Sequence, residues 1–114
     1  MNNIEKAKST VQEFIDFLNL LYQQNYGVNL QIGILEELTE ELDTIWVFSY
    51  DSTSGVKGHE LMGTSPLIVE KDTLDIYQTL NNISFEENLS LYMEGADDIK
   101  KLEKDENGIW DIVD

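Results

Sequence analysis

The sequence contains no cysteine and no arginine, and it has one histidine and one proline. Without cysteine, disulfide bonds, thiolate zinc sites and cysteine nucleophiles are excluded. A single histidine also argues against a transition-metal site, since such sites draw most of their remaining ligands from histidine. A small domain without disulfide bonds is typical of a reducing compartment.

Long apolar runs are missing as well. The first residues show no basic segment followed by an apolar stretch, and no later segment approaches the roughly 18 to 20 apolar residues of a membrane span. We therefore expect a cytoplasmic protein that does not enter a membrane.

Positive charge is scarce, because seven lysines stand against 23 acidic residues and the formal net charge is -16. Nucleic acid is an unfavourable partner, since binding its phosphates requires cations. An anionic membrane surface is disfavoured for the same reason. The field would attract a basic protein surface, but acidic surfaces also serve solubility alone, and composition leaves both explanations open.

What is present suffices for one folded domain. The chain has 114 residues, of which 41% are hydrophobic, enough for a packed core but not for two independent ones. We expect a single domain over 1–114, with its core over 3–95 and a C-terminal extension over 96–114.

The first 25 residues carry apolar side chains at alternating spacings of three and four. This spacing predicts an amphipathic helix over 3–25. Asn2 followed by Glu5 resembles a capping box, and Gly27 supplies the left-handed residue that commonly ends a helix. The apolar positions are Ile4, Ala7, Val11, Phe14, Leu18 and Leu21.

Strand patterns follow the helix. Alternation over 28–34 predicts a strand with one buried face, and the run over 44–50, apolar on both sides, predicts a central strand. A third strand begins at Leu67, after Pro66, where a missing N–H does least harm, and a fourth covers 74–79. Short connections favour antiparallel pairing with the long helix on one face.

Ser84 and Glu87 form a second capping-box pattern before a short helix that Gly95 ends. Beyond Ala96 the chain is mostly charged, and its apolar segment 109–113 is expected to add a short strand or to dock on the core. The sequence thus predicts an α+β fold: an N-terminal amphipathic helix packed on a four-stranded antiparallel sheet, followed by a short C-terminal helix and a charged tail.

Acidic residues cluster in the connection 36–43 between the first two predicted strands. They could form an electrostatic landing site for a basic partner, or they could only keep a hairpin soluble; both readings stay open. A catalytic acid needs burial to raise its pKa, whereas these side chains flank a turn and should be solvated. We therefore predict no catalytic residue and no cofactor. The candidate partner-binding residues are Glu36, Glu37, Glu40, Glu41 and Asp43.

The segment 103–114 places oxygen-bearing side chains and a glycine at several positions of a calcium-binding loop. Its first, eighth and last positions are occupied by Glu103, Trp110 and Asp114, which depart from the EF-hand pattern. We favour a plain turn at 107–108, because Asn-Gly is a strong hairpin signal.

The single histidine, His59, lies in a polar, glycine-containing loop over 51–63, near Ser52 and Ser54. A serine–histidine arrangement of this kind needs fixed geometry to catalyse a reaction, which a loop of this composition does not provide. We interpret His59 as a surface residue.

The segments 46–50 and 61–73 together resemble the central signature of the immunity protein 35 family. That family shows a tryptophan-containing strand, a Gly-x-x-Pro entry to an apolar strand, and an acidic-Lys-x-Thr-Gly turn before a further strand and a helix. The resemblance covers about 28–95. Its structural positions in this chain are Trp46, Gly63, Pro66, Lys71 and Thr73.

One position departs from the family pattern. Leu74 stands where the family has the turn glycine, and leucine would be strained if a left-handed conformation were needed there. We therefore expect the hairpin to be built differently in this chain.

The resemblance implies a small bacterial protein, encoded near a secreted toxin, that protects its producer by binding the toxin domain without catalysis. The sequence-based hypothesis is an immunity protein whose acidic surface steers it to a toxin with a basic surface. An alternative is a general protein-binding or chaperone-like adaptor that acts through an apolar patch or a sheet edge. An enzyme with carboxylate chemistry would need a pocket that holds a buried Asp or Glu.

Overall fold

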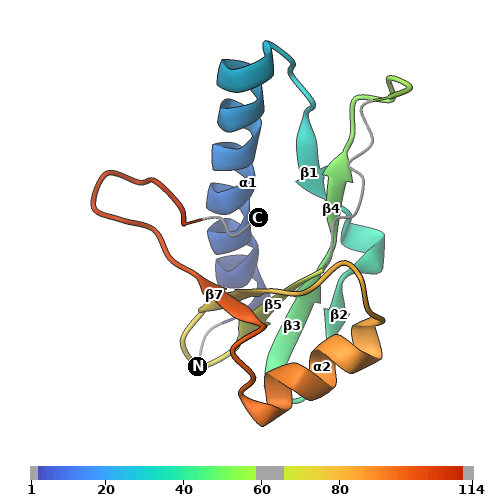
Figure 1. The fold of residues 1–114 in the computed structure, drawn as a ribbon, viewed down its shortest axis with the longest axis vertical. Coiled ribbons are helices and arrows are strands. Elements are labelled where there is room, and N and C mark those ends of the chain that lie inside the picture. The colour runs from blue at the N-terminus through green and yellow to red at the C-terminus, as the bar shows by residue number, and fades with distance from the viewer. Residues whose placement is uncertain (1–2, 59–65, 112–114) are drawn as a thin grey trace.

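The computed structural model describes residues 3–58 and 66–111 and shows an α+β fold with antiparallel sheets (Figure 1). The predicted fold class is therefore confirmed. In chain order the elements are α1 (Ile4–Tyr26), β1 (Ile32–Ile34), the 3-10 turn η1 (Glu36–Leu38), β2 (Glu40–Glu41), β3 (Ile45–Phe48), β4 (Tyr50–Ser52), β5 (Leu67–Glu70), β6 (Ile76–Gln78), α2 (Phe85–Glu94) and β7 (Lys100–Leu102).

Both ends of α1 are formed by residues suited to them. The Asn3 side chain accepts a hydrogen bond from the Lys6 N–H at 3.0 Å, so Asn3, one residue after the predicted position, caps the helix. At the other end Gly27 takes a left-handed conformation with φ of 65°, as the sequence predicts. The predicted helix is confirmed to within one residue at each end.

The prediction of one four-stranded sheet is wrong, because the strands form two sheets. The larger has five strands in the order β2-β3-β5-β6-β7, and the smaller pairs β1 with β4. The predicted central run 44–50 is divided: β3 pairs with β5 in the larger sheet, while β4 pairs with β1. The residues 51–52, expected in a loop, belong to β4.

A side chain of α1 binds the backbone of β1, which lies outside the larger sheet. The Asn19 amide accepts a hydrogen bond from the Ile32 N–H at 2.7 Å and donates one to the Ile32 carbonyl at 3.1 Å. These bonds satisfy backbone groups that a sheet neighbour would otherwise satisfy, and they fasten β1 to the helix. The position beside β3 is then taken by β2.

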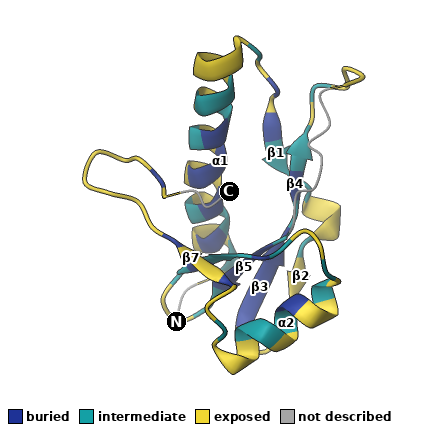
Figure 2. Cartoon of the chain, in the orientation of Figure 1, coloured by how far each residue is buried: buried dark blue, intermediate teal, exposed yellow. Residues whose placement is uncertain are grey.

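The five-stranded sheet is covered on both faces. Trp46 and Phe48 of β3 belong to the large core cluster beneath α1, whereas Ile45 and Val47 pack with residues of α2. Figure 2 shows β3 as buried throughout. This two-sided cover explains the double-sided apolar pattern of the strand and confirms its interior position in the sheet.

The charged tail takes part in the fold. Residues 100–102 form β7 at one margin of the larger sheet, and Leu102 lies in the core. Trp110 docks on the core, one of the two outcomes expected for its segment, with its ring 5.5 Å from that of Phe14 at an angle of 76°. The Lys104 ammonium lies 2.6 Å from the Glu13 carboxylate of α1.

The β5–β6 hairpin places Leu74 in the left-handed conformation in which leucine was expected to be strained. Leu74 has a φ of 63°, for which glycine is suited, and its partly buried side chain packs against the core. Packing of the side chain offsets the backbone strain.

Neither helix in the described ranges is long and apolar enough to cross a membrane.

Candidate functional site

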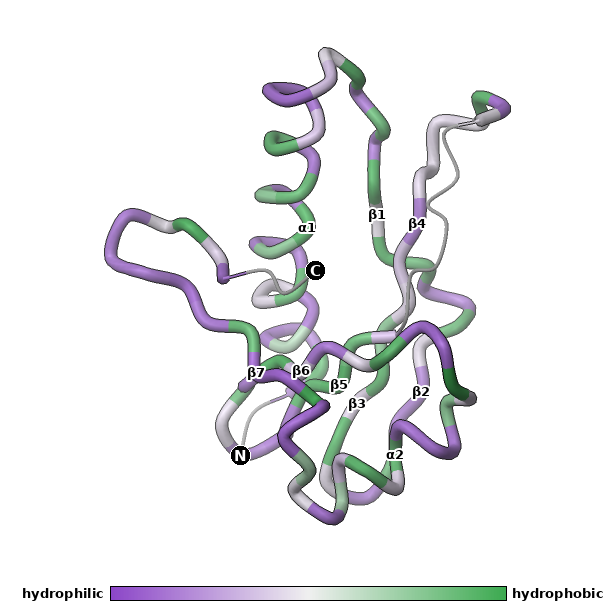
Figure 3. Tube along the Cα trace, viewed as in Figure 1, coloured by the Kyte–Doolittle hydropathy of each residue, from purple (hydrophilic) through white to green (hydrophobic). Residues whose placement is uncertain are grey.

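The five predicted carboxylates lie on η1, on β2 and in the turn before β3, and all five are exposed. Because β2 ends the strand order of the larger sheet, they lie at a margin of that sheet, with Asp43 in the hairpin turn that joins β2 to β3. Figure 3 shows this margin as hydrophilic, beside the hydrophobic β3. We call Glu36, Glu37, Glu40, Glu41 and Asp43 the acidic edge.

Two carboxylates of the acidic edge are paired with lysines. The Glu36 carboxylate lies 3.1 Å from the Lys8 ammonium of α1, and this hydrogen bond raises the pKa of Lys8. The Glu41 carboxylate lies 2.7 Å from the Lys71 ammonium, whose hydrogen bond and charge lower the pKa of Glu41. Glu41 is therefore held ionised by its neighbour of opposite charge.

The other three carboxylates, Glu37, Glu40 and Asp43, form no ion pair with any lysine that the structure describes. Leu38 and Leu42 stand among them with 53% and 37% of their surfaces exposed. Exposed apolar side chains rimmed by charge are typical of protein interfaces, where the apolar part supplies contact area and the rim supplies orientation.

Two residues of the family-like motif adjoin this surface. The Trp46 ring is buried opposite Glu41 in the β2–β3 pairing, and the Lys71 ammonium lies 5.4 Å from its centroid. Lys71 thus links the acidic edge to the core. The sequence did not indicate this connection, because Lys71 lies 30 positions from Glu41 and Trp46 lies on the neighbouring strand.

Pro66 and Thr73 act within the scaffold. The Pro66 carbonyl accepts a hydrogen bond from the Thr79 hydroxyl at 2.6 Å. The Thr73 hydroxyl donates to the Glu70 carboxylate and accepts from the Asp75 N–H, both at 3.1 Å. The remaining motif residue, Gly63, lies outside the described residues.

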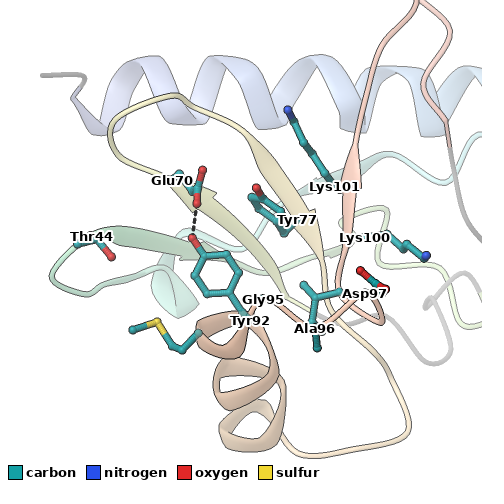
Figure 4. Close-up of a pocket in the computed structure, with 11 residues that line it drawn as sticks. Thr44, Glu70, Tyr77, Tyr92, Gly95, Ala96, Asp97, Lys100 and Lys101 are labelled. Carbon is teal, nitrogen blue, oxygen red and sulfur yellow. Dashed lines mark hydrogen bonds between the residues drawn. The ribbon is translucent and has the colours of Figure 1, made fainter.

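A groove of about 610 Å³ lies beside the C-terminal end of α2 (Figure 4). The Tyr92 hydroxyl donates a hydrogen bond to the Glu70 carboxylate at 2.5 Å, and the Tyr92 ring meets that of Tyr77 edge-on at 5.2 Å. Burial, followed by the bond to Glu70, raises the pKa of Tyr92, and burial also raises that of Tyr77. Both phenols stay protonated at neutral pH.

The bond between Tyr92 and Glu70 joins α2 to the sheet. One Glu70 oxygen accepts from Tyr92 and the other from Thr73. Sequence reasoning missed the groove because its lining comes from β5, β6, β7, α2, the segment after α2 and Thr44, which no local pattern brings together.

The two weaker sequence candidates have simple structural explanations. The Asp105 side chain accepts hydrogen bonds from the N–H groups of Asn107 and Ile109, both at 2.9 Å, so the predicted turn is confirmed. The Ser52 hydroxyl donates to the Leu30 carbonyl at 2.5 Å. His59 and Asp114 lie outside the described residues.

Within the part of the chain that the structure describes, no three His, Cys, Asp or Glu side chains are grouped to hold a metal ion. The acidic edge therefore remains as the surface with a distinct chemical character. Comparison of the chain with protein-family models, with curated proteins and with solved structures found no match.

Proposed function

We propose that this chain is an immunity protein that binds a bacterial toxin domain through a basic surface of that domain and so neutralises it. The observation that carries the proposal is the acidic edge, where three exposed carboxylates without an ion pair to a described lysine alternate along the chain with two exposed leucines. The resemblance to the immunity protein 35 family motif supports the same function.

Charge would act mainly on the rate of encounter. The net charge of -16 creates a negative field around the molecule, and complementary fields raise association rates by about 10 to 1,000-fold at low salt. Unpaired, exposed carboxylates are suited to this task because a partner cation meets them without displacing a lysine. Leu38 and Leu42 would then supply the apolar contact that slows dissociation.

Neutralisation would follow from occlusion. A toxin domain that attacks nucleic acid needs a basic groove to hold its substrate's phosphates. An acidic protein seated on that groove competes with the substrate directly, and this mechanism requires no catalytic residue in the chain.

The experiment uses the C-terminal domain of a secreted protein encoded beside the gene for this chain. Association is measured by stopped flow at several salt concentrations, with toxin activity as the second readout. Neutralising the three unpaired carboxylates should slow association about tenfold or more at low salt and flatten its salt dependence. The test variant carries Glu37→Gln, Glu40→Gln and Asp43→Asn, and the matched control carries Glu86→Gln, Asp98→Asn and Glu106→Gln, all exposed.

The control variant has the same net charge as the test variant, so equal slowing in both would assign the effect to total charge. Unchanged kinetics in the test variant would reject the acidic edge as the landing site. Failure of the domain to copurify with this chain and to be neutralised by it would reject the function itself.

An adaptor that binds through an apolar patch is the second candidate. Leu20 and Tyr26 near the C-terminal end of α1 are 52% and 72% exposed, and the Tyr22 ring lies 5.8 Å from that of Tyr26. Such binding would be nearly insensitive to salt and would extend to unrelated proteins, which the same salt series distinguishes.

A further inference from the structure

The margin of the larger sheet at β2 is not covered by any other strand of the described residues. Its pairing with β3 is antiparallel, and the strand order places no further strand of the described chain beyond it. Figure 1 shows β2 at the outside of the sheet, beyond β3. A strand with one unpaired side is a template for an extended segment of another protein.

The pairing register identifies the backbone groups that face outward. The Leu42 N–H donates to the Ile45 carbonyl at 2.9 Å, so these two residues form a hydrogen-bonded pair. Such pairs alternate along an antiparallel ladder, which makes Glu40 and Val47 the next one. Between them, Glu41 directs its N–H and its carbonyl away from β3.

The side chains of β2 define what an added strand must carry. Glu41 lies opposite Trp46 and shares its face of the sheet, whereas Glu40 lies opposite Val47 on the other face. Directly opposed side chains on neighbouring strands are about 5 Å apart. An added strand therefore meets one carboxylate on each face, that of Glu41 being already bound to Lys71 through one oxygen, and basic side chains at two successive positions complement these carboxylates.

Apolar contact is available on both sides of this pair. Leu38 precedes β2 and Leu42 follows it, and both are exposed. Glu37 and Asp43, which have no ion pair with a described lysine, extend the negative charge in both directions. A segment that fits this edge carries two adjacent basic residues with apolar residues near them.

The opposite margin of the same sheet presents different side chains. Its edge strand β7 bears Lys100 and Lys101, and Lys101 is paired with Asp75 and Glu103. A basic segment meets two lysines on that strand and two glutamates on β2.

We propose that the outward side of β2 takes up an extended segment of the partner, with two successive Lys or Arg residues, as an additional strand of the larger sheet. The inference rests on the proposed function, for which it specifies how the toxin domain is held. Backbone hydrogen bonds hold the segment in place, and Glu40 and Glu41 select its charge.

The test is a titration of the ¹⁵N-labelled protein with a capped eight-residue peptide that has lysine and arginine at its centre and alternating valine and threonine beside them. Saturable shifts are expected at the backbone amides of 38–43. Two further peptides each carry one backbone N-methyl group, on one or the other central residue. Because alternate N–H groups of a strand face the same neighbour, one methyl group should abolish binding and the other should leave it within about threefold.

Reversing one charge tests the selection. Glu40→Lys should weaken binding about tenfold, since it replaces an attraction by a repulsion, whereas Glu86→Lys on the surface of α2 should not change it. Folding of both variants is checked by circular dichroism.

Three results would overturn the inference. The first is amide shifts outside 38–43, and the second is an equal effect of the two N-methyl groups on binding. The third is that β2 pairs with the lysine-bearing β7 of a second copy of the chain and that the peptide only displaces this copy. Neutralisation of the toxin domain despite any of these results would leave the proposed function standing without this mode of binding.

Discussion

Substitution of Leu74 by glycine and by alanine tests the strain in the β5–β6 turn. Residue 74 has a φ of 63°, which costs a residue with a Cβ atom about 1 to 2 kcal/mol and costs glycine nothing. Glycine loses about 0.4 to 1 kcal/mol more than alanine on folding, because its unfolded chain is freer. The difference leaves Leu74→Gly more stable than Leu74→Ala by about 0.5 to 1 kcal/mol.

Loss of the leucine side chain adds the same cost to both variants. Leu74 is partly buried against the core, so its removal should lower the free energy of unfolding by about 1 kcal/mol, roughly half the value for a fully buried leucine. Leu74→Gly should therefore lie close to the wild type, with Leu74→Ala clearly below it.

The assay is urea unfolding followed by the fluorescence of Trp46 and Trp110, both buried in the core. Ser9, exposed within α1, supplies the control pair, since there Ser9→Ala should be more stable than Ser9→Gly by about 1 kcal/mol. An alanine variant as stable as the glycine variant at position 74 would refute the argument from strain.

Two further predictions concern the larger core cluster and the sheet that branches from it. Burial, followed by the neighbouring Tyr22, raises the pKa of Tyr50 to about 12, so the contribution of its protonated phenol to stability is complete below pH 10 and is lost as the pH rises to 12. Tyr50→Phe should remove up to about 2.7 kcal/mol of this alkaline loss of stability, measured as the urea midpoint against pH. An equal loss in both proteins would contradict the prediction. Asn19→Ala should lower the free energy of unfolding by about 2 kcal/mol, since it removes the two hydrogen bonds between the Asn19 amide and the Ile32 backbone. Hydrogen exchange of backbone amides should speed up first in β1. A uniform increase along the chain would show that Asn19 does not hold this strand locally.

The sequence was most informative where a pattern repeats over several turns or strands. The apolar spacing of α1, with a left-handed glycine after it, predicted the helix closely, and the double-sided apolar run of β3 predicted an interior strand. The division of the strands into two sheets was not predictable from a local pattern, and neither was the bond between Asn19 and a strand 13 residues away.

Edge strands were missed for a related reason. β2 consists of two glutamates and β7 of two lysines and one leucine, so both are too short to carry the alternation by which a strand is recognised. The five carboxylates of the acidic edge were identified from composition, yet their position at a sheet margin followed only from the register of β2. The groove beside α2 left no local signal at all.

The contact between Phe14 and Trp110 has a consequence for biosynthesis. Its two rings, and the neighbouring pair of Glu13 with Lys104, join segments about 90 residues apart, so the apolar stripe of α1 leaves the ribosome long before its last core partner. Until then part of the apolar surface of the helix lacks its last partner. The protein completes its core only after residue 110 has emerged.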